Sequence, residues 1–142
     1  MTVKQLSVFI ENRQGRLGEV LRVLKDNEVN ILSLSLADTT EYGLLRLIVN
    51  DPERGCEVLL GAGFSGMLTD VVIIKIPHKA GSLQEILSKI TEANVNIEYM
   101  YGLSVEANDA SIVMKTNELD IACEVLKNIK VDTMSSEEMR SL

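Results

Sequence analysis

A duplicated segment constrains this chain more than any other feature of its sequence. Shifted by 66 positions, the sequence places seven identical residues opposite one another between positions 15 and 31, where unrelated sequences share about one. At a shift of 67, Cys56-Glu57-Val58-Leu59 matches Cys123-Glu124-Val125-Leu126. A period this long that occurs only twice indicates two domains of one fold, because solenoid repeats are shorter and more numerous. We therefore expect one domain over residues 1–68 and a second over residues 69–142.

Both copies show the same order of predicted elements. Alternating apolar residues predict strands, and apolar residues with helical spacing predict helices, beginning in one case at the capping pair Asp51-Pro52. The first copy is expected to have strands near residues 6–10, 32–36, 44–49 and 64–68, and helices near 17–24 and 52–59. The second copy is expected to have strands near 72–76, 97–105, 110–115 and 130–134, and helices near 83–90 and 119–126. The pattern predicts an α+β protein of two ferredoxin-like βαββαβ units with antiparallel sheets.

Several predicted strands are apolar on both faces. Leu47-Ile48-Val49 and Val71 to Ile74 have no polar alternation, so the sheet face that the helices leave uncovered is expected to meet another sheet, helix or chain. No linker rich in Pro, Gly or Ser separates the last strand of the first copy from Val72. We therefore expect the two domains to be packed together, and we expect a homodimer.

Charge and hydropathy exclude two classes of partner. The 14 Lys and Arg residues against 21 Asp and Glu residues give a net charge of −7, which opposes binding to nucleic acid and to anionic membranes. The longest unbroken apolar stretch, Val71 to Ile74, is far shorter than the roughly 18 residues of a membrane-spanning helix. The first residues lack the pattern of a signal peptide, so a cytoplasmic location is expected.

The sequence offers little for catalysis. The sole histidine is His78, and no Cys-x-x-Cys, Gly-x-Ser-x-Gly or histidine cluster is present, so no catalytic group, metal site or cofactor is expected. Cys56 and Cys123 lie on predicted apolar helix stripes, which favours two small buried side chains over redox thiols.

The most informative positions lie where the first strand of each copy meets the first helix. These turns read Asn12-Arg13-Gln14-Gly15-Arg16-Leu17 and His78-Lys79-Ala80-Gly81-Ser82-Leu83. A glycine there allows a tight turn, and the start of the following helix presents unpaired N–H groups that attract a small anion. A carboxylate on these groups, with a nearby Asn amide for an ammonium group, would hold a free amino acid. The alternative is that each glycine only turns the chain.

An asparagine recurs at the start of each second strand. Asn30 and Asn96 occupy this position although Asn has a poor strand propensity. Such a strand can lie beside the beginning of the first helix, which would place the asparagine at the turn. The alternative is that these residues cap or turn the end of the helix.

These motifs resemble the ACT domain, whose sequence is commonly Asn/Asp-Arg-Pro-Gly-x-Leu, a helix, and then Val-Asn-Ile. The resemblance covers both copies, with Val29-Asn30-Ile31 and Val95-Asn96-Ile97 completing them. It implies βαββαβ units, regulatory binding of amino acids at interfaces between paired domains, and no catalysis by the domain itself. Serine-binding ACT domains use a loop Asn and a second-strand Asn, which Asn12 and Asn30 match. Asn96 matches in the second copy, whereas His78 replaces the loop Asn, and Gln14 and Ala80 stand where proline is usual.

The resulting ligand-binding prediction comprises both turns and the starts of both second strands. Its members are Asn12, Arg13, Gln14, Gly15, Arg16, Leu17, Asn30, Ile31, His78, Lys79, Ala80, Gly81, Ser82, Leu83, Asn96 and Ile97.

The two turns differ at the position after glycine. Ser82 and Glu85 have the spacing of a capping box, which would satisfy N–H groups that a ligand carboxylate would otherwise use. Arg16 cannot cap and would be favourable beside an anion, so the first turn is expected to be the better anion site. The alternative is an exposed arginine without a role. Tyr99 and Tyr101 alternate on one strand and are expected either to line a pocket or to pack across an interface.

The sequence thus predicts a non-catalytic regulatory protein that binds a small amino acid at interfaces between ACT-like domains and acts on a metabolic enzyme. One alternative is a small acylphosphatase-like enzyme, since these also bind an anion at the first loop with an Arg and use an Asn. Another is a structural dimer module without a ligand. An RNA-binding version of the fold is disfavoured because the third strands carry residues such as Leu45 and Val113 in place of aromatic ones.

Overall fold

The computed structural model describes residues 1–38, 41–105 and 109–142. By its contacts, the chain divides into two compact units. One, here called the N-terminal unit, contains residues 4–69 and 137–142. The other, the C-terminal unit, contains residues 1–3 and 70–136.

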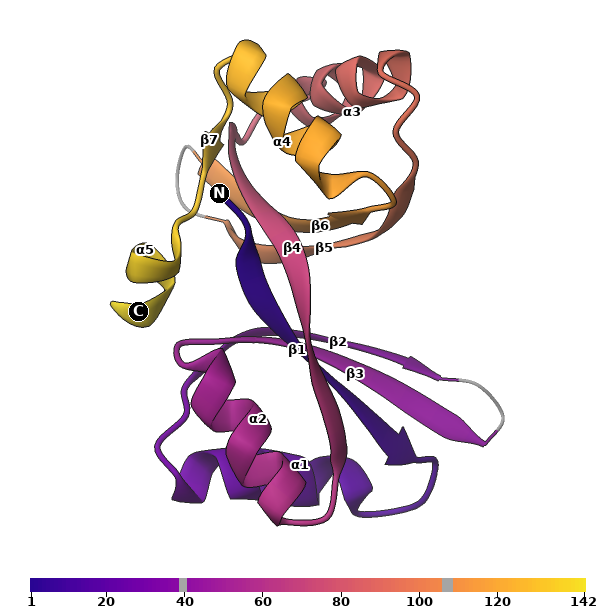
Figure 1. The fold of residues 1–142 in the computed structure, drawn as a ribbon, viewed down its shortest axis with the longest axis vertical. Helices are drawn as coiled ribbons and strands as arrows, with labels where there is room; N and C mark the ends of the chain where they lie inside the picture. Colours follow the sequence, from indigo (N-terminus) through magenta and orange to yellow (C-terminus); the bar gives the residue numbers. More distant parts are fainter. Residues whose placement is uncertain (39–40, 106–108) are drawn as a thin grey trace. The chain divides into compact units, whose positions relative to one another are not determined.

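The N-terminal unit is a sheet with two helices on one face (Figure 1). Its sheet has the order β2-β3-β1-β4, and β1 pairs with β3, and β3 with β2, in antiparallel fashion. Ser7 on β1 and Thr69 on β4 approach through their hydroxyl oxygens at 3.3 Å. The elements are β1 (Val3–Glu11), α1 (Arg16–Asp26), β2 (Ile31–Asp38), β3 (Tyr42–Val49), α2 (Pro52–Gly61) and the first part of β4 (Ser65–Pro77), with α5 (Ser136–Arg140) near the end of the chain.

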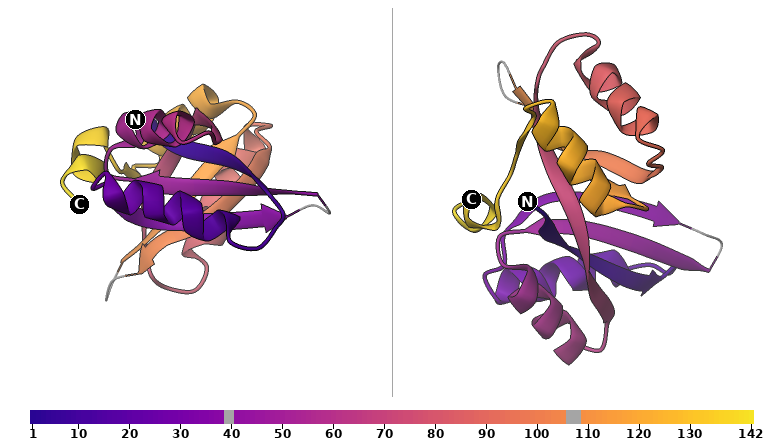
Figure 2. Two further views of the ribbon diagram at one scale, coloured as in Figure 1. Left: turned by 90° about the horizontal axis from the view of Figure 1, so that it is seen from below. Right: turned by 45° about the horizontal axis from the view of Figure 1, so that its top comes forward.

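The C-terminal unit repeats this plan, as the two views in Figure 2 also show. The second part of β4 lies between β6 and β7, and β5 pairs with β6 at the edge, all antiparallel. Its other elements are α3 (Ser82–Glu92), β5 (Ile97–Val105), β6 (Asp109–Thr116), α4 (Leu119–Asn128) and β7 (Asp132–Thr133). The predicted α+β, ferredoxin-like fold is therefore confirmed.

Three details differ from the sequence prediction. The strands expected near residues 64–68 and 72–76 form one continuous strand, β4, of 13 residues, and the segment between them is not a loop. The closing strand expected over 130–134 is only two residues long. The short helix α5 was not predicted, because its single buried residue, Met139, gives no apolar periodicity.

Local chemistry sets the helix ends, and the ends of α1 and α3 have the same geometry in the two copies. Asp51 caps α2, since its side chain accepts a hydrogen bond from the N–H of Arg54 at 3.2 Å. After α1 and α3, Glu28 and Asn94 adopt left-handed conformations with φ of 58° and 61°. The next residue then donates back to the helix, as in the 2.9 Å bond from the N–H of Val29 to the carbonyl of Leu24.

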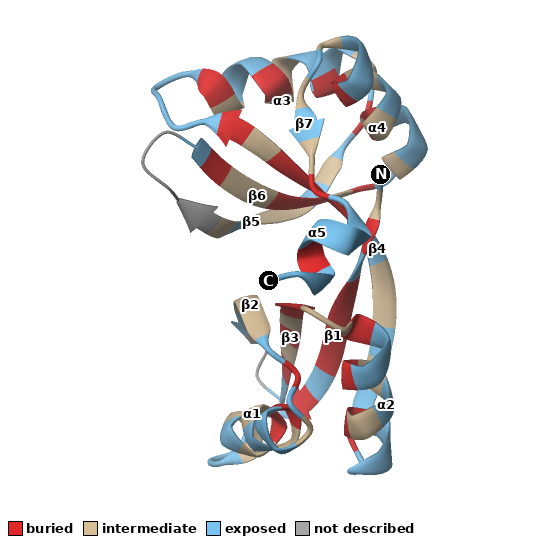
Figure 3. Ribbon diagram, turned by 90° about the vertical axis from the view of Figure 1, so that its left-hand side faces the viewer, coloured by how far each residue is buried: buried red, intermediate tan, exposed pale blue. Residues whose placement is uncertain are grey.

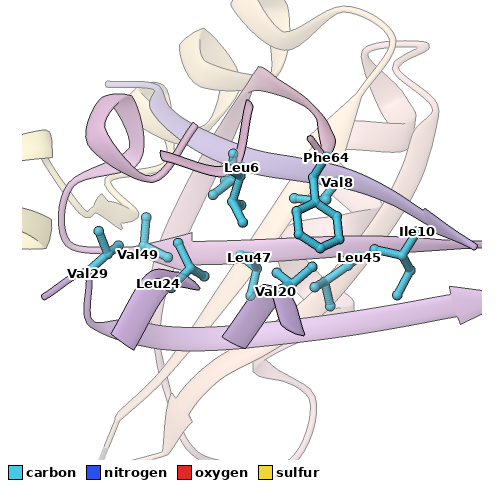
Figure 4. Packing of buried hydrophobic residues seen from close by; sticks show 11 residues of the cluster. Leu6, Val8, Ile10, Val20, Leu24, Val29, Leu45, Leu47, Val49 and Phe64 are labelled. Atoms are coloured by element: carbon cyan, nitrogen blue, oxygen red, sulfur yellow. The ribbon is translucent and has the colours of Figure 1, made fainter. Parts of the chain in front are cut away.

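Each unit has its own apolar core between its helices and its sheet. Figure 3 marks the buried residues, and Figure 4 shows the first core, in which side chains of α1 such as Val20 and Leu24 meet those of β1 and β3. The second core contains the equivalent residues Ile86 and Ile90 of α3. The run from Val71 to Ile74 is fully buried, which agrees with its lack of polar alternation.

Cys56 and Cys123 are free thiols that pack against the two cores, as their positions on apolar helix stripes predicted, but each is only partly buried and not buried as expected. Desolvation by burial raises the pKa of both thiols; at Cys123 the charged amino terminus opposes this rise and Asp120 adds to it. Within the described residues, each helix is too short or too polar to cross a membrane.

Candidate functional site

The two glycine turns have nearly the same backbone. Gly15 and Gly81 precede α1 and α3 with φ of 88° and 87°, a left-handed conformation that favours glycine. The turn closes through hydrogen bonds from the N–H of Arg16 to the carbonyl of Arg13 and from the N–H of Ser82 to that of Lys79, at 3.4 and 3.3 Å. Backbone geometry therefore favours a glycine at both positions.

The beginning of each helix has open backbone donors. The N–H groups of Glu19 and Glu85 bond to the carbonyls of Gly15 and Gly81, each at 3.0 Å. The preceding donors, Leu17 and Gly18 in α1 and Leu83 and Gln84 in α3, have no hydrogen-bond partner within the described part of the chain. Such donors at a positive helix end suit an anion.

The expected capping box at Ser82 is wrong. Gly81 is the capping residue of α3 and makes no side-chain hydrogen bond, so Ser82 is the first residue inside the helix. From there its hydroxyl oxygen does not reach the N–H groups of the first turn, and it is buried without a partner among the described residues. The N–H groups at the start of α3 are therefore not satisfied by Ser82, and in this respect the two turns are alike.

Arg16 is neither exposed nor free. Its guanidinium lies 4.3 Å from the centre of the Phe64 ring and pairs with Glu19 at 2.6 Å. Its side chain is 17% exposed. Because Glu19 neutralises this charge, the reason for expecting the first turn to be the better anion site is lost.

The expectation that each second strand begins beside the start of the first helix is also wrong. Asn30 follows the end of α1, and Gly15 precedes its beginning. An 11-residue helix separates them, which is about 16 Å at 1.5 Å per residue. The same holds for Asn96 and Gly81 at the two ends of α3. Within one unit, the turn and the asparagine therefore lie at opposite ends of one helix.

The starts of both second strands are fixed by hydrogen bonds to two further asparagines, which were not predicted as site residues from the sequence. The side chain of Asn50 accepts a hydrogen bond from the N–H of Asn30 at 2.9 Å, and the N–H of Asn50 donates to the carbonyl of Asn30 at 3.0 Å. Asn117 and Asn96 make the same pair of bonds at 3.0 and 3.1 Å. Asn50 and Asn117 are 67 positions apart, the shift already seen in the second helices, and this spacing was the available signal.

The other predicted residues of the turns are exposed. Asn12 donates its N–H to the carbonyl of Glu41 at 3.1 Å, and Arg13 pairs with Glu11 at 3.0 Å. The remaining exposed turn residues are Gln14, His78, Lys79 and Ala80. Leu17, Ile31, Leu83 and Ile97 are partly buried against the cores. A hollow of about 410 Å³ at the end of α1 is lined by Asn30 and Ile31, among other residues.

A pocket of about 390 Å³ lies at the second turn. His78, Lys79 and Leu83 line it from the turn and α3, and Met100 and Gly102 line it from β5. Tyr101 also borders it and stacks on Tyr99, with ring centres 6.5 Å apart. Tyr101 therefore borders this pocket, whereas Tyr99 is not among its lining residues. Among the residues described, no group of three acidic, histidine or cysteine side chains could hold a metal ion.

Comparison with known proteins agrees with this fold. The chain matches the family described as ACT domain pair over residues 1–142. No curated protein matches it by sequence.

Among solved structures, protein BT0572 from Bacteroides thetaiotaomicron is 38% identical, with a TM-score of 0.94 and coverage of 100% of this chain and 98% of that one. Two more distant structures are regulatory subunits of aspartate kinase. The ligand-free subunit from Thermus thermophilus is 12% identical with a TM-score of 0.64, and the subunit from Thermus flavus is 13% identical with a TM-score of 0.60. Each alignment covers 88% of this chain and 90% of the other. The likeness to these two subunits is one of fold. From the family match over its whole length, the chain belongs to the ACT domain pairs.

Proposed function

We propose that this protein is a non-catalytic regulatory protein that binds a free amino acid at its glycine turns. The observation that carries the proposal is the pair of open backbone donors at the start of α1 and again at the start of α3. They suit the carboxylate of an amino acid, while the amide oxygen of Asn12 or the ring of His78 would accept from its ammonium group.

A complete site needs a second domain face. Each turn and its asparagine are about 16 Å apart. The N–H donors and the Asn amide of one unit therefore cannot contact the same amino acid. A second molecule of this chain could supply the missing group. If its helix ran antiparallel to the helix of the first molecule, its asparagine would lie beside the glycine turn of the first molecule. The site would then lie at a dimer interface.

The edge of the N-terminal sheet supports such a dimer. Leu34 and Leu36 of β2 lie opposite the buried Leu47 and Leu45, so they share the helix side of the sheet, yet each is 46% exposed. Two exposed leucines beside the free edge of a sheet favour association with another strand.

Regulation would follow because the bound amino acid stabilises the dimer interface. A ligand that binds only the assembled site shifts the protein toward the state that contains it, and such coupling typically amounts to about 1–3 kcal/mol. We propose a metabolic enzyme as the regulated partner, in line with the regulatory subunits of aspartate kinase that share the fold. A cytoplasmic location fits this partner.

A thermal-shift screen against the twenty amino acids tests the proposal. A ligand at a hundredfold excess over its Kd adds about 2.7 kcal/mol to the stability of the protein, which raises the melting temperature by several degrees. Light scattering with and without the ligand would report the dimer. If no amino acid shifts the melting temperature at millimolar concentration, the proposal is wrong. Hydrolysis of an added acyl phosphate would instead favour the acylphosphatase-like alternative.

A further inference from the structure

The two copies differ in the space beside their edge strands. In the C-terminal unit, Gly102 of β5 forms part of the wall of the 390 Å³ pocket. A methyl group added at Gly102 would meet no atom within 4 Å, and its φ lies outside the left-handed region. A β-carbon is therefore sterically acceptable at Gly102, and the space beside this residue is open because glycine has no side chain.

The first copy has a leucine at the equivalent position. Leu36 lies 66 positions before Gly102 and faces Leu45 across the sheet, as Gly102 faces Ile112. The Cδ1 atom of Leu36 is 3.3 Å from the position that a Cβ on Gly43 would occupy. In the first copy, the leucine side chain thus lies over the sheet where the second copy has open space.

The charge beside the turn differs as well. Arg13 in the first copy pairs with Glu11 at 3.0 Å. In the second copy the equivalent residues are Lys79 and Pro77, so the acidic partner is replaced by a residue without a charge. Lys79 also lines the pocket. An anion therefore meets a favourable ammonium group at the second turn, whereas Glu11 opposes it at the first.

The pocket walls favour an apolar ligand group. Leu83, Met100 and Ile112 line it together with Ala110, and its volume is in the range of small-molecule sites. A polar side chain placed among these residues would lose its water without gaining a hydrogen bond, whereas an apolar side chain would gain from burial.

From these observations we infer that the second copy alone forms the amino-acid pocket, and that its ligand has a sizeable apolar side chain, such as leucine, methionine or phenylalanine. This inference rests on the proposed function. The carboxylate lies toward Lys79 and the open donors at the start of α3, and the side chain fills the space above Gly102. Each chain binds one ligand.

Isothermal titration calorimetry of the full chain with leucine, phenylalanine and serine tests this inference. We expect leucine or phenylalanine to bind with one ligand per chain and at least tenfold more tightly than serine. Gly102→Leu, which introduces the residue of the first copy, should weaken that binding at least tenfold. Its far-UV circular dichroism and urea unfolding should match the wild type, because the added side chain enters open space. Gly61→Leu in α2 is the matched control, since a side chain there also meets open space and Gly61 does not line the pocket.

The possible outcomes distinguish the inferred specificity and position of the pocket from the proposed function. Preferential binding of serine or another polar amino acid would overturn the apolar specificity while leaving amino-acid binding in place. Unchanged affinity in Gly102→Leu, or two ligands per chain, would overturn the assignment to the second copy. Absence of binding by all three amino acids and by the rest of the twenty would overturn the proposed function together with this inference.

Discussion

The two glycines at the start of α1 should respond in opposite directions to the same substitution. Gly15 has a φ of 88°, and an alanine there must adopt a left-handed conformation that costs about 1–2 kcal/mol. Part of this cost, about 0.4–1 kcal/mol, is offset because alanine also restricts the unfolded chain. No atom lies within 4 Å of an added Cβ, so sterics contribute nothing further. Gly15→Ala should therefore lower the free energy of unfolding by about 1 kcal/mol.

Gly18 lies in the first turn of the same helix with ordinary helical geometry and open space around its Cα. Gly18→Ala should raise the free energy of unfolding by about 0.5–1 kcal/mol, because alanine loses less conformational freedom in a helix. The two variants should thus differ by about 1.5–2 kcal/mol in stability. Gly15→Asn should fall between Gly15→Ala and the wild type, since asparagine tolerates the left-handed region.

Urea unfolding followed by far-UV circular dichroism measures this difference. Gly15 and Gly18 belong to the N-terminal unit, so both variants report on one transition whether or not the two units unfold together. The dependence on urea concentration should be unchanged, which would exclude an effect on the compactness of the unfolded chain. Equal stability of the two alanine variants, or a Gly15→Ala protein as stable as the wild type, would refute the reasoning.

Three further predictions concern the rest of the chain. Asn117→Ala removes the acceptor of a 3.0 Å hydrogen bond and should cost about 0.5–1.5 kcal/mol in urea unfolding, whereas Asn96→Ala keeps both backbone bonds and should cost less. Phe64→Ala opens the first core, where Phe64 is 5% exposed, and should cost about 3–5 kcal/mol by the same assay, with Phe64→Leu costing less. Burial raises the pKa of the Cys123 thiol, so its contribution to stability is present below the ordinary thiol pKa of about 8.5 and is lost as pH rises through the raised pKa. Stability measured between pH 7 and 10 should consequently fall less steeply in Cys123→Ala than in the wild type, and an identical slope would contradict this.

The fold could be predicted because its signals are local and occur twice. Alternating strands, amphipathic helices and the cap at Asp51 each depend on neighbouring residues, and the duplication supplied every signal a second time. The continuity of β4 could not be predicted in this way. Thr69 and Asp70 interrupt the apolar pattern at its middle and therefore resemble a loop, although both belong to strand β4 in the structure.

The candidate site could be predicted only in part. The left-handed glycines were identified because few other residues suit that conformation. The position of Asn30 was misjudged although the chain order indicates it: Asn30 directly follows the end of α1, so it lies near that end of the helix and not near Gly15. The pocket at Gly102 was missed for a different reason. The sequence prediction used residues that are identical in the two copies. This pocket arises instead from a difference between them, because Gly102 stands where the first copy has Leu36.

The two units are not consecutive stretches of sequence, and this affects how the chain can be divided. The boundaries between them fall after residues 3, 69 and 136, so each unit contains a short segment from the far end of the chain. A fragment ending at residue 69 would lack residues 137–142, including the ion pair of Arg140 with Glu53 at 3.1 Å. A fragment starting at residue 70 would lack the first three residues of its own unit. Cutting the chain between the two copies of the duplication would therefore deprive each unit of a terminal segment that lies in the other half of the sequence.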